Sequence, residues 1–282
     1  MQFQMDTAEI FVPDGLATQP ALARTTHLAI GAHPDDIEIT ANEGILKCFQ
    51  RDDLWFTGVT VTNGSGSARE GLYRDYTDAE MQVVRRKEQK KAAILGEYGA
   101  QVMLDYSSGA VKDRTNKGPQ IDLTSLLQIA RPEVVYTHNL ADRHDTHVAV
   151  ALAAIEAMRT LPAGERPRHV YGCECWRDLD WLVDADKVTF DVSEHENLQT
   201  ALIGLYDSQI AGGKRYDLAA LGRRRANATY LASHSVDTAI GMILAIDLTP
   251  LIQDDSLDVS EYALGFIERF ATEVRERVNR LR

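Results

Sequence analysis

Short apolar runs alternate with helix-length segments over the first 175 residues, and this alternation limits the fold more than any other feature. The runs typical of strands are 27–31, 54–61, 101–104, 134–137 and 169–176, and the segments with helical spacing are 37–50, 78–98, 121–130 and 148–159. Because each connection is long enough to hold a helix, successive strands can run parallel. The sequence therefore predicts an α/β fold, a mostly parallel sheet flanked by helices.

The two ends of the chain are less regular than its middle. Residues 1–24 have no clean periodicity and are expected to form an irregular N-terminal extension. The C-terminal third predicts helices at 194–206, 216–230 and 260–280 and a strand at 239–247. Since no linker interrupts the chain, we expect one domain over 25–282. Its core would span 26–175, and residues 176–282 would be a C-terminal extension of the same unit that closes a site or makes subunit contacts.

Charge and cysteine content exclude several classes of protein. The chain has 30 Lys and Arg against 42 Asp and Glu, a net charge of -12, which disfavours nucleic acid and anionic membranes as partners. No apolar run approaches the roughly 20 residues of a membrane span, and the first residues lack a secretory signal pattern. Three cysteines cannot build a disulfide framework, so we expect a cytoplasmic protein. Cys173 and Cys175 are interpreted as small core residues rather than a metal pair.

Two polar clusters follow two of the predicted strands. Ala32-His33-Pro34-Asp35-Asp36 comes directly after the run at 27–31, and a segment with three histidines, 138–147, follows the run at 134–137. The carboxyl ends of parallel strands meet at one edge of a sheet, where open α/β folds bind their ligands. We therefore expect both clusters to contribute to one site.

The residue types in these clusters favour a divalent metal ion. His33 and Asp36 lie about one helical turn apart, and His147 can supply a third ligand, which leaves an open position for water. Asp35 beside such a water is placed as a general base, and His144 could face the substrate. A purely structural alternative is that these acidic residues only cap the helices that follow.

Three segments of the sequence resemble the LmbE/PIG-L-like deacetylases, which are zinc-dependent enzymes that remove N-acetyl groups from glucosamine-containing compounds. The motifs are Ala32-His33-Pro34-Asp35-Asp36-Ile37-Glu38, then Asp142-Arg143-His144-Asp145-Thr146-His147, and the helical Arg85-Arg86-Lys87-Glu88 with Ala92-Ala93-Ile94-Leu95-Gly96. The resemblance covers about residues 26 to 175.

The resemblance implies a Rossmann-like α/β fold with a metal at the carboxyl end of the sheet. It implies His33, Asp36 and His147 as ligands of Zn²⁺, with Fe²⁺ or another divalent ion as the alternative. Asp35 would be the general base, and His144, in its protonated form, would stabilise the tetrahedral intermediate. Four further residues are candidates for substrate binding: Arg69, Asp142, Arg143 and Asp145.

The chain departs from the family pattern at two places. Thr146 occupies the position of the Asp that usually supports the neighbouring histidine, and Asp142 or Asp145 could substitute for it. Glu43-Gly44 stands where relatives often have Gly-Gly. Because of Thr146, a sugar-binding or metal-binding homologue without catalysis stays open as an alternative.

The expected function is metal-dependent removal of an N-acetyl or other acyl group from an N-acetylglucosamine-type sugar or conjugate. Hydrolysis of another small amide by the same metal site is the close alternative. A dinucleotide-dependent oxidoreductase is disfavoured, because no Gly-x-Gly-x-x-Gly follows the first strand of the predicted core. A small amino sugar is the expected partner, and self-association into a homo-oligomer is compatible with the sequence.

Three other segments have two interpretations each. The basic islands at 212–216 and 222–225 are interpreted as solvated surface, with the mouth of a substrate site as the alternative. The polar and aromatic loop 64–77 is typical of a segment that covers a substrate, but it could equally contact another subunit.

Overall fold

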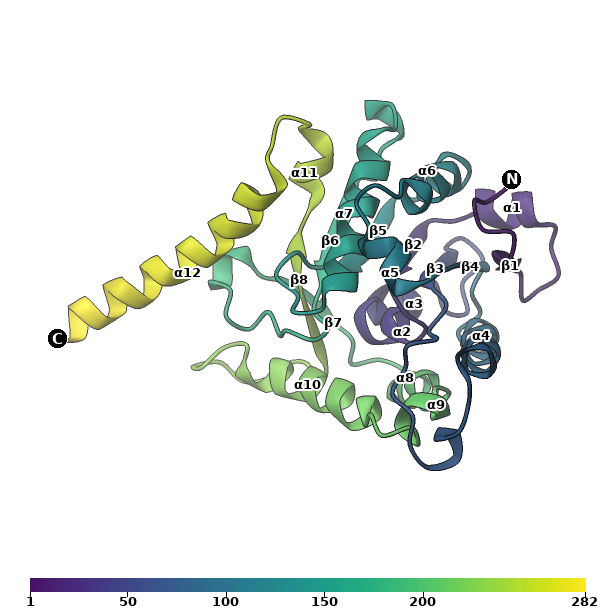
Figure 1. Ribbon diagram of the computed structural model, residues 1–282. Coiled ribbons are helices and arrows are strands. Elements are labelled where there is room, and N and C mark those ends of the chain that lie inside the picture. The colour runs from purple at the N-terminus through teal and green to yellow at the C-terminus, as the bar shows by residue number, and fades with distance from the viewer.

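The computed structural model covers residues 1–282, and its centre is an eight-stranded sheet with the order β1-β4-β3-β2-β5-β6-β8-β7 (Figure 1). The strands are β1 (Glu9–Phe11), β2 (His27–Gly31), β3 (Phe56–Thr62), β4 (Ala100–Tyr106), β5 (Val134–His138), β6 (His169–Cys173), β7 (Val188–Asp191) and β8 (Met242–Asp247). The five strands from β4 to β6 are parallel, whereas β1 and β8 run antiparallel to their neighbours. The predicted mostly parallel α/β fold is confirmed.

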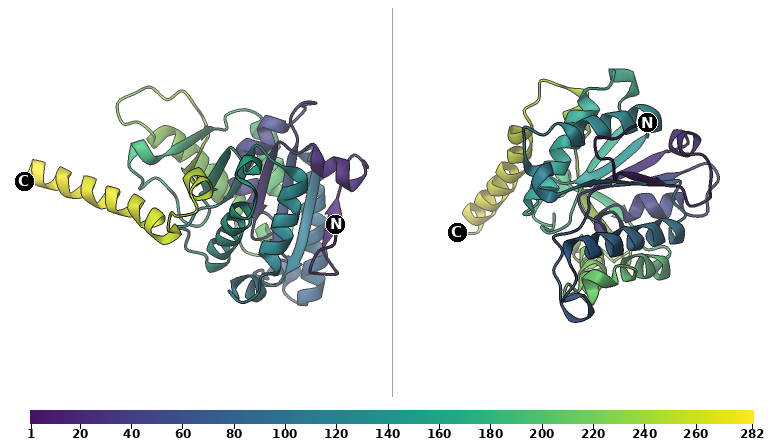
Figure 2. Two further views of the ribbon diagram at one scale, coloured as in Figure 1. Left: turned by 90° about the horizontal axis from the view of Figure 1, so that it is seen from above. Right: turned by 45° about the vertical axis from the view of Figure 1, so that its right-hand side comes forward.

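Helices cover both faces of the sheet (Figures 1 and 2). One face carries α1 (Thr18–Ala23), α5 (Ser108–Lys112), α6 (Gly118–Ala130) and α7 (Asp145–Arg159). The other carries α2 (Asp36–Thr40), α3 (Asn42–Cys48), α4 (Asp78–Leu95), α8 (Glu196–Gly204) and α9 (Asp207–Ile210). The remaining helices are α10 (Tyr216–Tyr230), α11 (Thr249–Gln253) and α12 (Val259–Leu281). None of these helices is long and apolar enough to span a membrane.

Local sequence explains why these elements form where they do. All five residues of β2 are buried, as expected for a central parallel strand covered on both faces. At the start of α4, Thr77 and Glu80 form a reciprocal capping box. Gly44 in α3 leaves room for the ring of Tyr136, because a Cβ at position 44 would lie 2.6 Å from that ring. The Tyr136 hydroxyl donates to Glu43, so the Glu43-Gly44 pair fits a tyrosine on β5.

The structure corrects three expectations about secondary structure. Residues 1–24 are irregular only in part, because β1 pairs with β4 and α1 packs against α6. The predicted helix 37–50 is two helices, α2 and α3, and the Thr40 hydroxyl donates to the Asp36 carbonyl at 2.8 Å near the break at Ala41. The short elements β7 and α5 were not predicted, since segments of four or five residues have too little periodicity to be recognised.

The strand order brings the two polar clusters together. β2 and β5 are parallel neighbours, with Leu28 opposite Val135, and the chain leaves them in opposite directions, toward β3 and toward β6. This reversal is the topological switch point of the sheet. The loops that follow β2 and β5 carry the predicted ligands, so the fold places them at one edge.

Candidate metal centre

The loop after β2 is held in shape by its own carboxylates and by α4. The backbone N–H of His33 donates to Oδ2 of Asp36 at 2.6 Å. Asp35 has a φ of 96°, in the left-handed region that residues with a side chain rarely adopt. Arg85 of α4 donates to the carbonyl of Pro34 within the same loop. A strained residue fixed by its surroundings is typical of a functional site.

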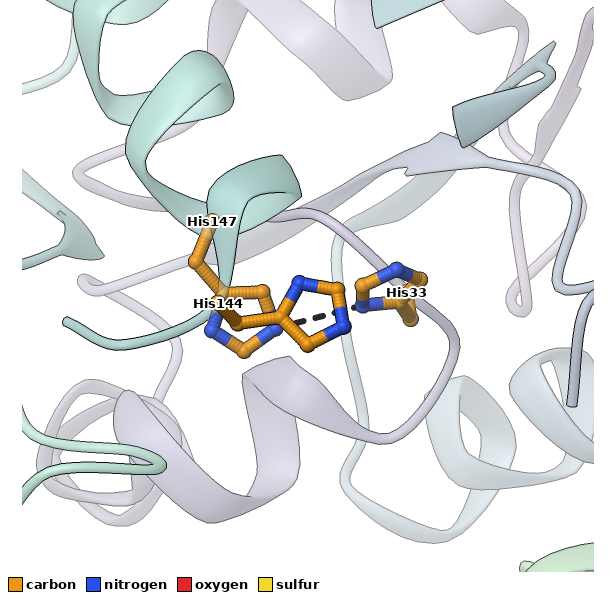
Figure 3. Close-up of side chains that lie close together, drawn as sticks. All are labelled: His33, His144 and His147. Carbon is orange, nitrogen blue, oxygen red and sulfur yellow. Dashed lines mark hydrogen bonds between the residues drawn. The ribbon is translucent and has the colours of Figure 1, made fainter. Parts of the chain in front are cut away.

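Three predicted ligand atoms converge on one point at this edge. Nδ1 of His33 lies 3.1 Å from Oδ2 of Asp36 and 3.2 Å from Nε2 of His147. Nε2 of His147 lies 3.4 Å from the same Asp36 oxygen. Figure 3 shows the rings of His33 and His147 meeting across the gap between the two loops. The structure therefore brings together the ligand set that the sequence predicts.

Asp142 fixes the orientation of His147. Its Oδ2 lies 3.1 Å from Nδ1 of His147, and its Oδ1 accepts the backbone N–H of His144 at 2.9 Å. Both side chains of the Asp142–His147 pair are fully buried. Burial alone would lower the pKa of His147, but Asp36 and Asp142 outweigh it and raise this pKa. Of the two acids that could substitute for the missing family Asp, Asp142 contacts the ligand histidine.

The two neighbouring acids, Asp35 and Asp36, have pKa values that are shifted in opposite directions. Burial would raise the pKa of Asp36, but the surrounding histidines, His147 first among them, hold it well below its usual value. Burial raises the pKa of Asp35 to about 7, with Arg85 opposing the rise and Asp36 adding to it. Asp36 is thus the permanent anion of the pair, and Asp35 is the acid that can exchange a proton near neutral pH.

His144 lies on the open side of the cluster. Its ring is stacked on that of His147, with 4.6 Å between the centroids, and edge-on to His33 at 5.0 Å (Figure 3). Burial, together with the charges of His147 and His33, lowers the pKa of His144. This direction disagrees with the protonated form expected from the family pattern. Nδ1 of His144 is buried without a hydrogen-bond partner, and Thr146 supplies no carboxylate for it.

His138 is a site residue to which the sequence analysis gave no role. It is fully buried, and its Nε2 accepts the backbone N–H of Ala32 at 2.9 Å. Its ring stacks on that of His147 with 3.8 Å between the centroids. Burial lowers the pKa of His138 to about 4, so the ring is neutral and can accept this bond. Its position as the last residue of β5 is the signal that could have found it.

Cys173 and Cys175 differ in how deeply they are buried. Cys173 is buried in β6, as the interpretation of a small core residue requires. Cys175 is only half-buried, lies 3.9 Å from Oδ1 of Asp36 and lines the cavity over the cluster. The core interpretation is therefore wrong for Cys175. Asp36, His147 and Cys175 also lie close enough together to be considered as metal ligands.

Three predicted substrate-binding residues are not part of the cluster. Arg69 donates to the carbonyl of Ser65 and pairs with Asp78, at the start of α4. Arg143 and Asp145 are exposed. None of the three lines the cavity described next. Asp142 does not line it either, because it lies behind His147.

A cavity of about 770 Å³ opens over the cluster. His33, Asp35, Asp36 and His144 lie among its lining residues, and the loop after β3 contributes Gly64, Gly66, Ser67 and Ala68. Trp176, Lys214, Tyr216 and Arg223 also line the cavity, so part of both basic islands lies at the cavity rather than on plain surface. Pockets of this size hold small organic molecules.

Comparison with known proteins identifies the family of the chain. Residues 28–158 match the family model described as "PIG-L: GlcNAc-PI de-N-acetylase". The chain is 30% identical over 162 residues to the "Uncharacterized deacetylase YaiS" of Escherichia coli K12, and the match covers 54% of this chain and 77% of that protein.

Solved structures share the fold at low identity. The N,N'-diacetylchitobiose deacetylase of Pyrococcus horikoshii has a TM-score of 0.60 and 17% identity, over 78% of this chain and 83% of that one. GalB, the 4-carboxy-2-hydroxymuconate hydratase of Pseudomonas putida KT2440, has a TM-score of 0.61 and 20% identity, over 79% of this chain and 96% of that one. These two matches establish the fold, and the sequence matches establish the family. The chain belongs to the PIG-L family of GlcNAc-PI de-N-acetylases.

Proposed function

We propose that this protein is a metal-dependent hydrolase that removes the acetyl group from an N-acetylglucosamine-type sugar or a conjugate of one. The observation that carries the proposal is the convergence of His33 Nδ1, Asp36 Oδ2 and His147 Nε2 within 3.1–3.4 Å of one another, under a cavity that Asp35 also lines. Membership in a de-N-acetylase family supports the same reaction.

The donor set fits a divalent ion such as Zn²⁺, with Fe²⁺ as the alternative. Ligand atoms about 2.0–2.2 Å from one tetrahedral ion lie roughly 3.3–3.6 Å from each other, which is close to the separations of these three atoms. The Asp142 carboxylate accepts a hydrogen bond from Nδ1–H of His147, and the lone pair of Nε2 would then be free to coordinate. An ion bound there would polarise water and the amide carbonyl.

Asp35 is proposed as the general base. Its carboxylate would take a proton from the water that attacks the acyl carbon, and it would return this proton to the leaving nitrogen, so that acetate and a free amine are the products. A pKa raised to about 7 suits both halves of this exchange. Arg85 fixes the Asp35 side chain through a contact of 3.3 Å.

His144 is proposed to stabilise the oxyanion of the tetrahedral intermediate. Because its pKa lies below the usual value, the ring is neutral at pH 7 and would donate through its N–H rather than as a cation. His144 lines the cavity, and its ring lies beside those of His33 and His147, so it would be next to an acyl group bound at these ligands.

The wall of the cavity suits a sugar. Trp176 lines it edge-on to Tyr216, with 5.9 Å between the ring centroids, and Nζ of Lys214 lies 5.2 Å from the Trp176 ring. An indole gives a flat apolar surface for a sugar ring, and nearby ammonium groups donate to hydroxyls or to an anionic substituent. This proposal favours the substrate-site interpretation of the basic islands.

Acetate release from a panel of N-acetylglucosamine conjugates, with and without a chelator, tests the proposed function. We expect release that stops with the chelator and returns with added Zn²⁺ or Fe²⁺. Other small amides in the panel test the alternative substrate class. A protein that binds the sugars but releases no acetate with any metal would be a homologue without catalysis. Since GalB, a hydratase, shares the fold, acetate is the product that distinguishes deacetylation from hydration.

A further inference from the structure

The C-terminal helix α12 extends away from the rest of the molecule (Figures 1 and 2). Only its first half is attached. Phe266 is its one buried residue, Phe270 packs edge-on to Trp181, and Arg269 pairs with Asp186. Beyond Phe270 the helix continues for three turns with no buried residue, and it projects from the molecule there.

A second side of α12 carries an exposed apolar stripe. Its members follow the alternating three- and four-residue spacing of a coiled-coil seam, and they are Leu264, Ile267, Ala271, Val274, Val278 and Leu281. The five larger side chains are 40% to 78% exposed. At 100° per residue, the stripe points well away from Phe266 and the body of the molecule. A polar surface would be expected on a free helix, so this stripe is typical of a contact surface.

We propose that α12 pairs with α12 of a second copy of this chain, in an antiparallel arrangement related by a twofold axis. In this arrangement the apolar side chains of the two helices meet in pairs, and there are three different pairs. Leu264 would lie opposite Leu281 of the second copy, Ile267 opposite Val278, and Ala271 opposite Val274. Each layer occurs twice because a twofold interface uses the same surface on both copies.

The charges that flank the stripe select the antiparallel direction. Glu261, Glu268, Arg275 and Arg282 occupy the flanking e positions, and none of the four forms an ion pair within its own chain. With the layers above, Glu268 lies beside Arg275 of the second copy, and Glu261 lies beside Arg282. Every flanking e position then meets an opposite charge.

In a parallel pair of helices, the charged residues that flank the stripe would have unfavourable neighbours. Arg282 would lie beside Arg277 of the second copy, and Arg275 beside Phe270, which already packs against its own Trp181. Like charges at these positions oppose pairing.

The antiparallel pair also keeps the folded bodies of the two copies apart. From Leu264 to Leu281 the helix rises about 26 Å, so each body would lie near the free end of the other helix.

Sedimentation velocity or light scattering of the full chain over a range of concentrations tests this pairing. We expect a dimer for the natural sequence and a monomer for Val274→Asp, because the aspartate would be buried in the central layers. Position 274 lies beyond the buried Phe266 and the half-buried Phe270 of α12, so the monomeric variant should stay folded and still unfold cooperatively in urea, at a somewhat lower denaturant concentration than the dimer. Glu276→Arg is the matched control, since it changes a charge on the opposite side of the same helix.

A charge exchange tests the direction of pairing. Glu268→Arg and Arg275→Glu each create two like-charged contacts in the twofold dimer and should raise its dissociation constant by roughly tenfold. The double variant Glu268→Arg/Arg275→Glu should recover the natural value. A natural protein that stays monomeric, a dimer that survives Val274→Asp, or single variants that the exchange does not rescue would each overturn the proposal. Monomeric protein that binds vesicles of phosphatidylcholine and phosphatidylserine through this stripe would overturn it as well.

Discussion

Nη2 of Arg85 lies 3.3 Å from Oδ2 of Asp35, and both side chains are buried. The same guanidinium donates to the carbonyl of Pro34 and lies 3.9 Å from Glu88, whose carboxylate accepts from the backbone N–H and the hydroxyl of Ser208. One arginine on α4 therefore connects the proposed general base to α9 of the C-terminal third.

Arg85→Met should destabilise the protein strongly. It leaves buried acids without their cation, and breaking a buried ion pair in this way costs about 3–5 kcal/mol. The free energy of unfolding in urea measures the effect. Arg86→Met is the control one residue away, because Arg86 forms partly exposed pairs with Glu9 and Asp105 that are worth about 0–1 kcal/mol each. Equal losses for the two variants would contradict the role given to Arg85.

Asp35→Asn should retain the metal and lose turnover. An amide cannot take the proton of the attacking water, so kcat should fall by roughly 10²–10⁴-fold. Metal content by elemental analysis and acetate release measure the two effects. Asp145→Asn is the control, because it makes the same chemical change at an exposed position, and it should keep about the natural rate. Full activity of Asp35→Asn would show that another group is the base.

Asp142→Asn should weaken metal binding without abolishing it. Asparagine has one acceptor oxygen for the two N–H groups that Asp142 binds, so it would hold the Nδ1 hydrogen of His147 less firmly, and weakening such a supporting contact lowers metal affinity by about 10–100-fold. His147→Ala should bind still more weakly because it removes a ligand atom. Competition with a chelator of known affinity ranks the variants. Identical affinities for the natural protein and His147→Ala would exclude this residue as a ligand.

Trp176→Ala should raise KM more than it lowers kcat. Trp176 lines the cavity but offers no group that exchanges protons or binds metal. Loss of a stacked sugar should raise KM by about tenfold, which corresponds to about 1.4 kcal/mol. Tyr230→Ala removes an exposed aromatic residue outside the cavity and serves as the control. An unchanged KM would mean that the substrate does not use this wall.

Stability below neutral pH should depend on His27. Burial lowers its pKa from 6.5, with Glu43 opposing the shift. The folded state therefore binds fewer protons than the unfolded state, and the natural protein loses stability as the pH falls through 6.5 and below. His27→Gln removes this loss, so its free energy of unfolding relative to the natural protein should rise over the same range. Urea unfolding from pH 7.5 to 5 measures it, with His234→Gln, an exposed site, as the control. If the free energies of unfolding of the natural protein and of His27→Gln changed equally with pH, the lowered pKa of His27 would be contradicted.

The sequence predicts the parts of the site that neighbouring residues determine. His33, Asp35 and Asp36 follow an apolar run directly, and His144 and His147 follow another, so strand prediction alone brings them to one edge. Rossmann-like order, in which β2 and β5 are adjacent, completes this placement.

Contacts between distant segments could not be predicted. Arg85 reaches Asp35 across 50 positions, and His138 accepts from Ala32 across 106, and neither contact leaves a periodic pattern in the sequence. Asp142 was one of two candidates to support the histidines, and only the geometry of the turn before α7 separates it from Asp145. Arg69 is a candidate for substrate binding by resemblance alone, and its pairing with the carboxylate of Asp78 is another contact that the sequence does not predict.

The order of strands at the far edge of the sheet has a consequence for synthesis. β7 precedes β8 by some fifty residues in the chain, yet β8 is its only partner and lies between it and β6. While the chain emerges from the ribosome, β2 to β6 can already assemble, but β7 has no edge to join until residue 247 has been made. We therefore expect nascent chains that stop before β8 to expose the edge of β6, and this stage to be the one most in need of a chaperone.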